Sequence, residues 1–424
     1  YNDFAVLYRT NAQSRIFEEA LRKRSMPYRI YGGLSFYQRK EIKDVISYFR
    51  LAVNPNDEEA LKRVINYPSR GIGDTTLNKI IEAANAYGTS LWKVLCEPLM
   101  FGVNINKGTH SKLQGFRDLI EHFIKEAMEK DASEVGRMIV YQSGIMNEIH
   151  QDRTPENLSR QENIEELVNG MHDFCATRRE EGNVHTLLTD YLAEVSLLTD
   201  QDNDKEGDGA KVTLMTIHSA KGLEFKNVFV VGLEENLFPS SMSMDSIRGL
   251  EEERRLFYVA ITRAEEHCFL SFAKTRYKFG KTEFSYPSRF LKDIDACYLQ
   301  LSQNEQMNQR MDEGNARFRP QNPLSFGTRF QSFMDETIER PKEQMVSSTP
   351  HHFRKVSSVV SSVPASTSTL GSLQAGNVIE HERFGIGKVE SVVGSGDNCK
   401  ATVRFQNAGV KQLLLKFARF KVIG

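Results

Sequence analysis

Two stretches of alternating strand and helix pattern, far apart in the chain, constrain its fold more than any other feature. Residues 4–9 (FAVLYR) have the apolar composition of a buried strand, residues 12–24 carry apolar side chains at helical spacing, and residues 26–33 return to a strand pattern. Strand, helix and strand within about thirty residues form a βαβ unit, which requires a parallel sheet covered by helices. Strand patterns resume only at residues 211–218 and 227–233. We therefore expect one α/β domain interrupted by a long insertion.

The insertion has a helical pattern. Residues 105–200 contain several amphipathic helix patterns and almost no β pattern. The run DQDNDKEGDG (200–209) is too rich in charge to be core and predicts an exposed hinge. The predicted division is residues 1–104 and 207–302 for the α/β domain, and residues 105–206 for an all-helical domain.

The last third of the chain changes character twice. Residues 303–373 are polar, rich in Ser, Gln and Asn and poor in periodicity, which is typical of a disordered, flexible linker. Residues 374–424 return to short β runs separated by Gly-bearing turns, and hold eight Lys or Arg against four Asp or Glu. We expect a small, modestly basic β barrel or sheet at this end.

Composition excludes several classes of protein. The 424 residues are 40% hydrophobic and 26% charged, as expected for two or three domains with real cores. No apolar run approaches the roughly 20 residues of a membrane helix, and the start has no signal-peptide pattern. The five cysteines are scattered without a CxxC pair, so we expect reduced thiols and no metal site. The net charge of −1 excludes a uniformly basic nucleic-acid coat but permits a local basic groove.

An arginine interrupts the apolar face of the helix predicted within residues 253–267. At about 100° per residue, Arg263 falls within an apolar stripe formed by Leu256, Val259, Ala260 and Ala264. A guanidinium is always charged and is costly to bury alone, so we expect Arg263 to face an anion. A neighbouring glutamate and the phosphate group of a ligand both satisfy this requirement.

The sequence contains no phosphate-binding loop. The strand VFVVGLEEN resembles a metal-binding acidic strand and the tripeptide AKG a phosphate loop, but neither fits. A phosphate loop requires G-x-x-x-x-G-K-[ST], in which backbone amides surround the phosphates and the lysine follows the second glycine. Nothing in the chain matches, so it has no nucleotide-gripping loop of its own.

Four segments, in order, carry a resemblance to a known family. They are AVLYRTNAQSR, GGLSFYQRKEIKDV, VTLMTIHSAKGLEF and EEERRLFYVAITRAEE, and the segments ENLFPS and YPSRF continue the pattern. Together they closely resemble the C-terminal motifs of superfamily 1 DNA helicases of the PcrA/UvrD/Rep group. The tail from residue 374 is similar, over a shorter match, to the Tudor-like module of the same group.

The resemblance implies an architecture and an activity. It implies a second RecA-like domain, an inserted helical domain known as 2B, a linker and a Tudor-like β module. It also implies a bacterial, cytoplasmic, nucleoid-associated helicase that uses ATP with Mg²⁺ to move 3′ to 5′ on DNA in repair or replication. The first RecA-like domain, with the phosphate loop and the metal-binding acids, is absent, so the chain alone should be inactive. Tyr1 stands directly before a strand without an initiator Met, so we expect a piece of a longer protein.

The resemblance assigns four residues to ATP. Arg9 and Arg263 match two arginines that reach the terminal phosphate, Tyr8 matches a residue that stacks on adenine, and Glu224 matches one near the nucleotide sugar. Such arginines stabilise the charge of the transferring phosphoryl group and are catalytic. From spacing alone, Arg9 and Arg263 are better interpreted as structural partners of nearby glutamates, because structural pairs outnumber catalytic ones, and only the motifs together favour the catalytic role.

Other residues are assigned to DNA. The resemblance places Thr216 and His218, at the end of a strand, on single-stranded DNA, and Phe279 against its bases. Arg39 and Lys43 lie one helical turn apart, a spacing that suits a phosphate backbone.

Two GIG tripeptides have different settings. The turn SRGIGDTT resembles a helix-hairpin-helix element, in which Gly71 and Gly73 expose amides to a phosphate, although a plain turn fits equally. The second GIG, within residues 384–389, lies in a β context and predicts a tight β turn.

Two functions follow. The first is a DNA motor, whose partners are single-stranded DNA, single-strand to duplex junctions, the N-terminal RecA-like domain of the same protein and, through the tail, RNA polymerase. The second is a non-catalytic adaptor that binds DNA and a protein partner. Neither function involves a membrane.

Overall fold

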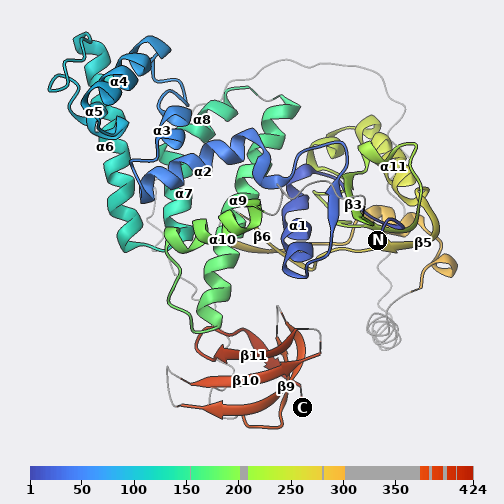
Figure 1. The fold of residues 1–424 in the computed structure, drawn as a ribbon. Coiled ribbons are helices and arrows are strands. Elements are labelled where there is room, and N and C mark those ends of the chain that lie inside the picture. The colour runs from blue at the N-terminus through green and yellow to red at the C-terminus, as the bar shows by residue number, and fades with distance from the viewer. Residues whose placement is uncertain are drawn as a thin grey trace, which may run out of the picture. The chain divides into compact units, whose positions relative to one another are not determined.

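The computed structural model describes residues 1–424 except for positions 153, 201–208, 279–280, 301–372, 382–383, 395–398, 407 and 424. The predicted linker and most of the predicted hinge therefore lie outside the described residues. The described chain forms an α/β domain, a helical domain and a small β module (Figure 1).

A parallel sheet of five strands is the centre of the α/β domain. Strand β3, from the far side of the insertion, lies between β1 and β2 of the N-terminal βαβ unit, so both halves of the domain share one sheet. This confirms the predicted α/β fold with an inserted helical domain. The sheet has the order β2-β3-β1-β4-β5, with β1 (Phe4–Tyr8), β2 (Tyr28–Ile30), β3 (Val212–Thr216), β4 (Phe225–Val230) and β5 (Ala264–Leu270).

Two helices connect strands of this sheet. Helix α1 (Ser14–Lys23) leads from β1 towards β2 and packs Phe17 and Leu21 onto the sheet. Helix α11 (Ile247–Ile261) leads from β4 to β5 and buries Phe257. Parallel sheets normally need helical cover on both faces, and these two helices provide part of it.

One part of the sheet surface stays open. Phe229 on β4 pairs in register with Val6 on β1 and with Phe269 on β5, so these side chains share the face that α1 covers. The Phe229 and Phe269 rings stack with centroids 4.6 Å apart, yet Phe269 and Phe4 remain exposed. Phe4, at the start of β1, and Phe269, on β5, therefore lie beyond the cover that the described helices give this face, whereas Phe229 on β4 is half-buried.

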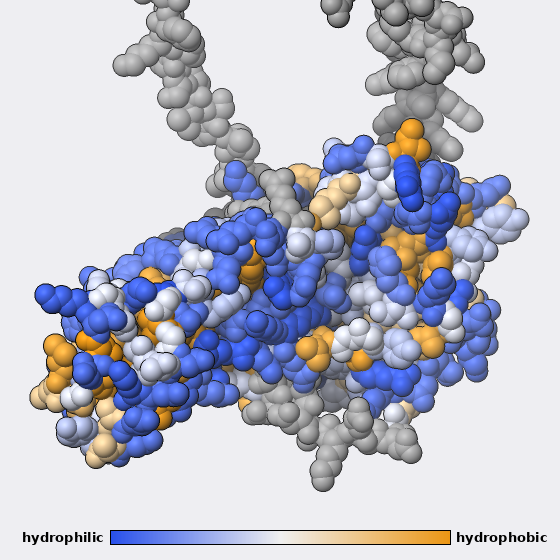
Figure 2. Space-filling model, turned by 90° about the horizontal axis from the view of Figure 1, so that it is seen from above, coloured by the Kyte–Doolittle hydropathy of each residue, from blue (hydrophilic) through white to orange (hydrophobic). Residues whose placement is uncertain are grey.

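The helical domain has one continuous apolar core. Its buried residues run from Phe36 to Val195, across the predicted boundary at residue 105, and that boundary stays a prediction. Figure 1 shows α4, α5 and α6 gathered at one end of this domain, and Figure 2 shows apolar patches there on a mostly hydrophilic surface, where Leu99 and Met100 are exposed. The helices are α2 (Lys40–Val53), α3 (Glu58–Val64), α4 (Asp74–Tyr87), α5 (Leu91–Cys96), α6 (Lys107–Glu129), α7 (Ala132–Gln142), α8 (Ile145–His150), α9 (Pro155–Glu180) and α10 (Leu188–Asp200).

Capping residues explain where several of these helices begin. Asp57, Asn106, Asp131 and Thr154 each accept a hydrogen bond from the backbone N–H three residues later, at 3.0, 2.7, 2.9 and 3.2 Å. Pro155 follows Thr154 at the first helical position, where the N–H that proline lacks has no partner in the helix.

The C-terminal module is an antiparallel sheet, as predicted. Its second GIG lies within a strand and not in a tight turn, which corrects the sequence interpretation. A Cβ on Gly387 would lie 2.7 Å from Cγ1 of Val403, so close packing between strands explains this glycine. The strand order is β11-β10-β9-β8-β12, with β8 (Val378–His381), β9 (Gly385–Val393), β10 (Lys400–Phe405), β11 (Gly409–Leu414) and β12 (Phe420–Val422).

The remaining elements are short. Strands β6 (Thr275–Lys278) and β7 (Lys281–Phe284) form an antiparallel pair after β5. In the described chain, no helix is long and apolar enough to cross a membrane. The short 3-10 helices are η1 (Asn11–Gln13), η2 (Phe36–Gln38), η4 (His218–Ala220), η5 (Ser241–Asp245), η6 (Arg289–Asp293) and η7 (Ala296–Tyr298).

Candidate functional site

The carboxyl ends of β1 and β3 bring together three of the predicted site residues. Arg9 follows β1, Thr216 ends β3, and His218 begins η4 directly after it. Tyr8 and Thr216 are partners in the parallel register, and the Ile217 N–H donates to the Tyr8 carbonyl oxygen at 3.0 Å. We call this end of the strands the carboxyl edge, and open α/β sheets bind ligands at this end.

A glutamate from α11 holds the Arg9 guanidinium. Nη2 of Arg9 lies 2.7 Å from Oε1 of Glu253, and Nε donates to both carboxylate oxygens at 3.2 and 3.1 Å. Glu253 is buried and also accepts from the Ser240 N–H at 3.4 Å and the Ser243 hydroxyl at 3.1 Å. For Arg9, the structure therefore contains the glutamate partner that the alternative interpretation expects.

Burial and the Arg9 charge set the protonation of this edge. Burial alone would raise the pKa of Glu253, but the hydrogen bonds and charge of Arg9, with those from Ser240 and Ser243, hold that pKa below its ordinary value. The pKa of His218 is lowered, first by partial burial and then by Arg9, against the opposing effect of Glu253. At neutral pH Glu253 is therefore ionised, and His218 is neutral.

Sequence reasoning missed Gln13, which fixes the backbone beside Arg9. Its Oε1 accepts the N–H groups of Arg9 and Thr10, both at 2.9 Å. Gly232, after β4, has a φ of +72° and lies against the Gln13 amide. Gln13 belongs to the segment AVLYRTNAQSR, and that membership was the available signal.

Arg263 does not lie in a helix, contrary to the prediction. Helix α11 ends at Ile261, and Arg263 occupies the turn before β5. Its guanidinium donates to the carbonyl oxygens of Val259 and Leu223 at 3.1 and 3.0 Å and to the Thr262 hydroxyl at 3.1 Å. Over the described ranges it forms no ion pair with a carboxylate, so only dipoles meet its charge.

Arg9 and Arg263 lie at opposite ends of the parallel strands. Leu7 on β1 pairs with Val230, at the carboxyl end of β4. At the other end of β4, the Phe225 N–H donates to the Arg263 carbonyl oxygen at 2.9 Å. We call this end of the strands the amino edge. The two arginines are about eight residues apart along the strands, or roughly 25 Å at 3.3 Å per residue. One phosphate cannot meet both guanidinium groups at that separation. The prediction that Arg9 and Arg263 share a terminal phosphate is therefore wrong for this structure.

The other predicted ATP residues are also divided. Tyr8 is 1% exposed within the sheet and has no free ring face for an adenine, which corrects its predicted role. Glu224 is exposed and precedes β4 at the amino edge, next to Leu223 and so on the side of Arg263. Phe279 lies outside the described residues.

Arg39 is a buried connection between elements. Its Nη1 donates to Oδ1 of Asn163 at 2.8 Å and its Nη2 to the Ser14 hydroxyl at 2.7 Å, and burial lowers its pKa. The side chain joins the start of α1 to α9, so the structure does not present it as an exposed cation for a phosphate backbone.

Lys43 differs from Arg39. It is exposed on α2 and lines a groove of about 570 Å³. The other cations of this groove, Arg50 and Arg63, are ion-paired with Asp57 and Asp44 at 2.6 Å each. Lys43 remains a candidate contact for a DNA phosphate. It lies on α2 and not at the ends of the strands that form the carboxyl edge.

The turn between α3 and α4 uses some of its amides internally. Oδ1 of Asn66 accepts the Ile72 N–H at 3.0 Å, and Nζ of Lys112 lies 3.3 Å from the Gly71 carbonyl oxygen. Gly71 has a φ of +67°, whereas Gly73 has an ordinary φ of −81° and opens onto free space at the start of α4. Both interpretations of this turn stay open.

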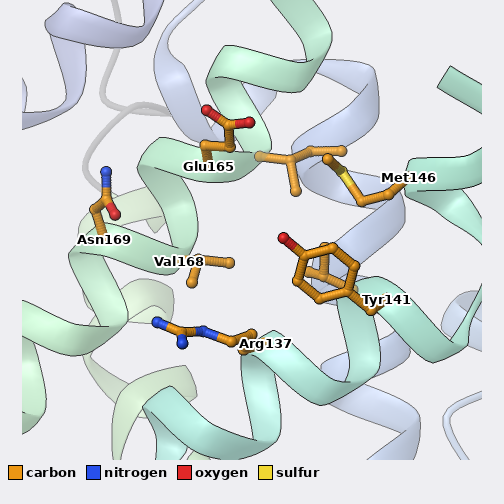
Figure 3. Close-up of a pocket in the computed structure, with 8 residues that line it drawn as sticks. Arg137, Tyr141, Met146, Glu165, Val168 and Asn169 are labelled. Atoms are coloured by element: carbon orange, nitrogen blue, oxygen red, sulfur yellow. The ribbon is translucent and has the colours of Figure 1, made fainter. Parts of the chain in front are cut away.

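A small cavity in the helical domain does not fit a nucleotide. It lies among α7, α8 and α9 with a volume of about 70 Å³, and Figure 3 shows Tyr141, Met146 and Val168 lining it. Ligand pockets usually have several hundred Å³. Across the described ranges, no group of three His, Cys, Asp or Glu side chains can hold a metal ion.

The arrangement of these segments matches one protein family. Residues 1–275 match the UvrD-like helicase C-terminal domain. The chain belongs to the UvrD-like helicase family. Residues 375–421 of this UvrD-like chain also match the PcrA/UvrD tudor domain.

Individual relatives agree with this assignment. The ATP-dependent DNA helicase PcrA of Leuconostoc citreum is 36% identical over 419 residues, which cover 99% of this chain and 53% of the relative. DNA helicase II of Escherichia coli strain K12 is 34% identical over 420 residues, which cover 99% of this chain and 51% of the relative. This UvrD-like chain thus spans about half the length of the curated relatives it matches.

Proposed function

We propose that this chain supplies two separate surfaces of an ATP-dependent DNA helicase, one at each edge of its parallel sheet. The carboxyl edge, with Arg9, Thr216 and His218, binds single-stranded DNA. The amino edge, with Glu224 and Arg263, faces ATP held by another RecA-like domain. The observation that carries this proposal is the separation of Arg9 from Arg263 by the length of the strands.

The amino edge suits a phosphate group. Arg263 is fixed by two carbonyl oxygens and a hydroxyl, and no described carboxylate competes for its charge. A guanidinium held in this way is a preorganised fork of donors for phosphoryl oxygens. ATP, when bound, supplies the phosphoryl group that is transferred to water. We propose that the domain that carries the phosphate loop holds the Mg²⁺, as the resemblance to the family implies.

The carboxyl edge suits a nucleic-acid strand, and the geometry leads us to move Arg9 from the ATP site to the DNA site. Two of its nitrogens bind Glu253, whereas Nη1 has no hydrogen bond within the described chain and can donate to a phosphate. His218 is exposed and neutral at this edge, which suits hydrogen bonding or stacking with a base. The Thr216 and Ser219 hydroxyl groups form a hydrogen bond with each other at 2.9 Å.

The finer parts of the function rest on the family alone. We propose 3′ to 5′ movement, a role in repair or replication, and action at single-strand to duplex junctions in a bacterial cytoplasm. We also propose that the Tudor-like module binds a protein, with RNA polymerase as the candidate. A non-catalytic adaptor is the competing function. An adaptor would use the DNA-binding residues of the carboxyl edge but would not need the ATP-facing residues of the amino edge.

The test uses the 424-residue chain itself. Fluorescence anisotropy with a labelled 15-nucleotide thymidine strand should show binding that weakens steeply as salt rises. A coupled ATPase assay with the same DNA should show no turnover above background. Absence of DNA binding at low salt contradicts the proposed carboxyl-edge function, and turnover by this chain alone contradicts the division of the ATP site between domains.

A further inference from the structure

We propose that Tyr31 is a stacking platform for a base of single-stranded DNA and extends the DNA-binding track beyond His218 to the end of β2. This inference rests on the proposed DNA-binding function of the carboxyl edge and adds a residue to it. The base recognised is of any type, because every base has a face that can stack on an aromatic ring.

The backbone of Tyr31 is fixed at the carboxyl edge. Tyr31 directly follows β2, and its N–H donates to the Leu214 carbonyl oxygen on β3 at 2.9 Å. This bond continues the register in which Ile30 pairs with Leu214. Because this backbone is already ordered, stacking of a base on the ring costs no further backbone conformational entropy at Tyr31.

The Tyr31 side chain is free for a ligand. Tyr28 and Ile30 pack into the cluster beneath α1, and strand alternation directs Tyr31 away from that face. Tyr31 is 43% exposed, and its ring has neither a hydrogen bond nor a ring contact within the described chain. No hydrogen bond or ring contact of the described chain therefore accounts for the exposed position of the Tyr31 ring.

The turn after Tyr31 brings it next to His218. Gly32 has a φ of +73°, and a Cβ at this position would lie 2.9 Å from the Ser219 hydroxyl oxygen. Ser219 is the residue after His218 in η4, so the end of β2 packs against the proposed DNA contacts. Leu34, also exposed, extends the apolar surface of this turn.

The charge around Tyr31 favours a polyanion. Arg29 is exposed two residues earlier on the same face of β2, with its Nε 3.2 Å from the Thr213 hydroxyl oxygen. Lys221 is exposed just after η4. Over the described ranges, neither cation forms an ion pair with a carboxylate. Cations interleaved with an exposed aromatic ring are the usual composition of a single-strand binding surface.

The test compares variants of the full chain in anisotropy titrations with the 15-nucleotide thymidine strand at low salt. Tyr31→Ala should weaken binding about 5- to 150-fold, the range expected for one stacked base. Tyr31→Phe should bind like the parent, because the ring and not the hydroxyl is used. Tyr141→Ala, at an exposed tyrosine on α7, is the matched control and should also bind like the parent.

A second measurement separates stacking from charge. Tyr31→Ala should leave the salt dependence of binding unchanged, whereas Arg29→Ala should reduce its slope by about one ion. The Tyr31 effect should also disappear with a strand of abasic sugars of equal length, since no base remains to stack.

The outcomes are distinguishable. If the chain binds DNA and His218→Ala weakens binding while Tyr31→Ala does not, the role of Tyr31 is overturned and the DNA-binding edge stands. If Tyr31→Ala weakens binding to the abasic strand equally, stacking is overturned. If the parent chain binds no DNA, the proposed function itself fails.

Discussion

Arg9 and Glu253, 244 residues apart in the sequence, form a two-pronged ion pair that ties the end of β1 to α11. The pair joins the first strand to the helix that precedes the last strand of the sheet. Glu253 in turn holds the loop before α11 through Ser240 and Ser243. Glu253 therefore cross-links the end of β1, the segment before α11 and α11 itself within this chain.

We predict that Glu253→Gln destabilises the chain by about 1.5–3 kcal/mol at neutral pH, because it weakens charged hydrogen bonds in a buried position. The pKa of Glu253 is lowered in the folded state. Its ionic contribution is therefore fully present above the ordinary value of 4.5 and is lost as pH falls through the lower, folded-state value. Urea unfolding at pH 7 and at progressively lower pH measures both effects.

The control for this variant is Glu252→Gln, one residue earlier on the exposed side of α11, where Glu252 forms an ion pair with Arg255. An exposed pair of this kind contributes about 0.2–1 kcal/mol. Equal losses from the two variants would show that Glu253 does not hold the edge.

For His218, we predict that DNA binding responds to acid. The lowered pKa keeps this side chain neutral at pH 7, and it gains a positive charge as pH falls through a value below 6.5. Binding of the thymidine strand should strengthen over that interval, because a new cation meets the phosphates. His218→Gln should remove the part of this response that belongs to the site. An unchanged pH profile in that variant argues against contact between His218 and DNA.

The first GIG turn offers a matched pair of substitutions. Gly71→Ala should destabilise the helical domain by about 1–2 kcal/mol, because a side chain is strained at positive φ. Gly73→Ala should be nearly neutral for stability, since its φ is ordinary and the space around it is open. Thermal melts measure stability, and binding of duplex DNA measures function. Weaker duplex binding by a fully stable Gly73→Ala supports the helix-hairpin-helix interpretation, and unchanged binding supports a plain turn.

At the amino edge, Arg263→Lys is the informative change. In a helicase that combines these residues with a phosphate-loop domain, ATP turnover should fall by about 10³-fold or more, because lysine cannot reproduce the guanidinium fork. Binding of nucleotide and of DNA should be largely retained. If turnover falls only in proportion to a lowered melting temperature, Arg263 is a structural residue that caps carbonyl oxygens.

The architecture was predictable because it depends on local patterns. Strand and helix periodicity located β1, α1, β3 and β4, and the return of strand pattern after the helical block predicted a shared parallel sheet. The order of the strands in the sheet, in contrast, is not contained in any local sequence pattern. The insertion of β3 between β1 and β2 decides which residues become neighbours across the sheet.

The candidate site was predictable only in part, for the same reason. Thr216 and His218 follow one strand, and their position at its end was clear from the sequence. The grouping of Arg9 with Arg263 failed because strand direction places one after a strand and the other before a strand. Arg263 was also assigned to a helix because the apolar period continues past Ile261, whereas the chain actually leaves the helix at Thr262 and enters β5. Burial of Tyr8 and Arg39 depends on neighbours distant in sequence, which periodicity does not reveal.

The exposed part of the α1 face restricts where a further strand and its connecting helix could be added to this sheet. Strand β5 is an edge strand of the described sheet. Phe269 on β5 and Phe4 on β1 are exposed on the α1 face, and Phe229 between them is half-buried. Crossovers between parallel strands are right-handed. A strand added outside β5 and connected onward to β1 would cross the sheet in the same direction as the β1 to β2 connection, so its helix must lie on the α1 face. The right-handed crossover would thus place that helix over the exposed rings of Phe4 and Phe269.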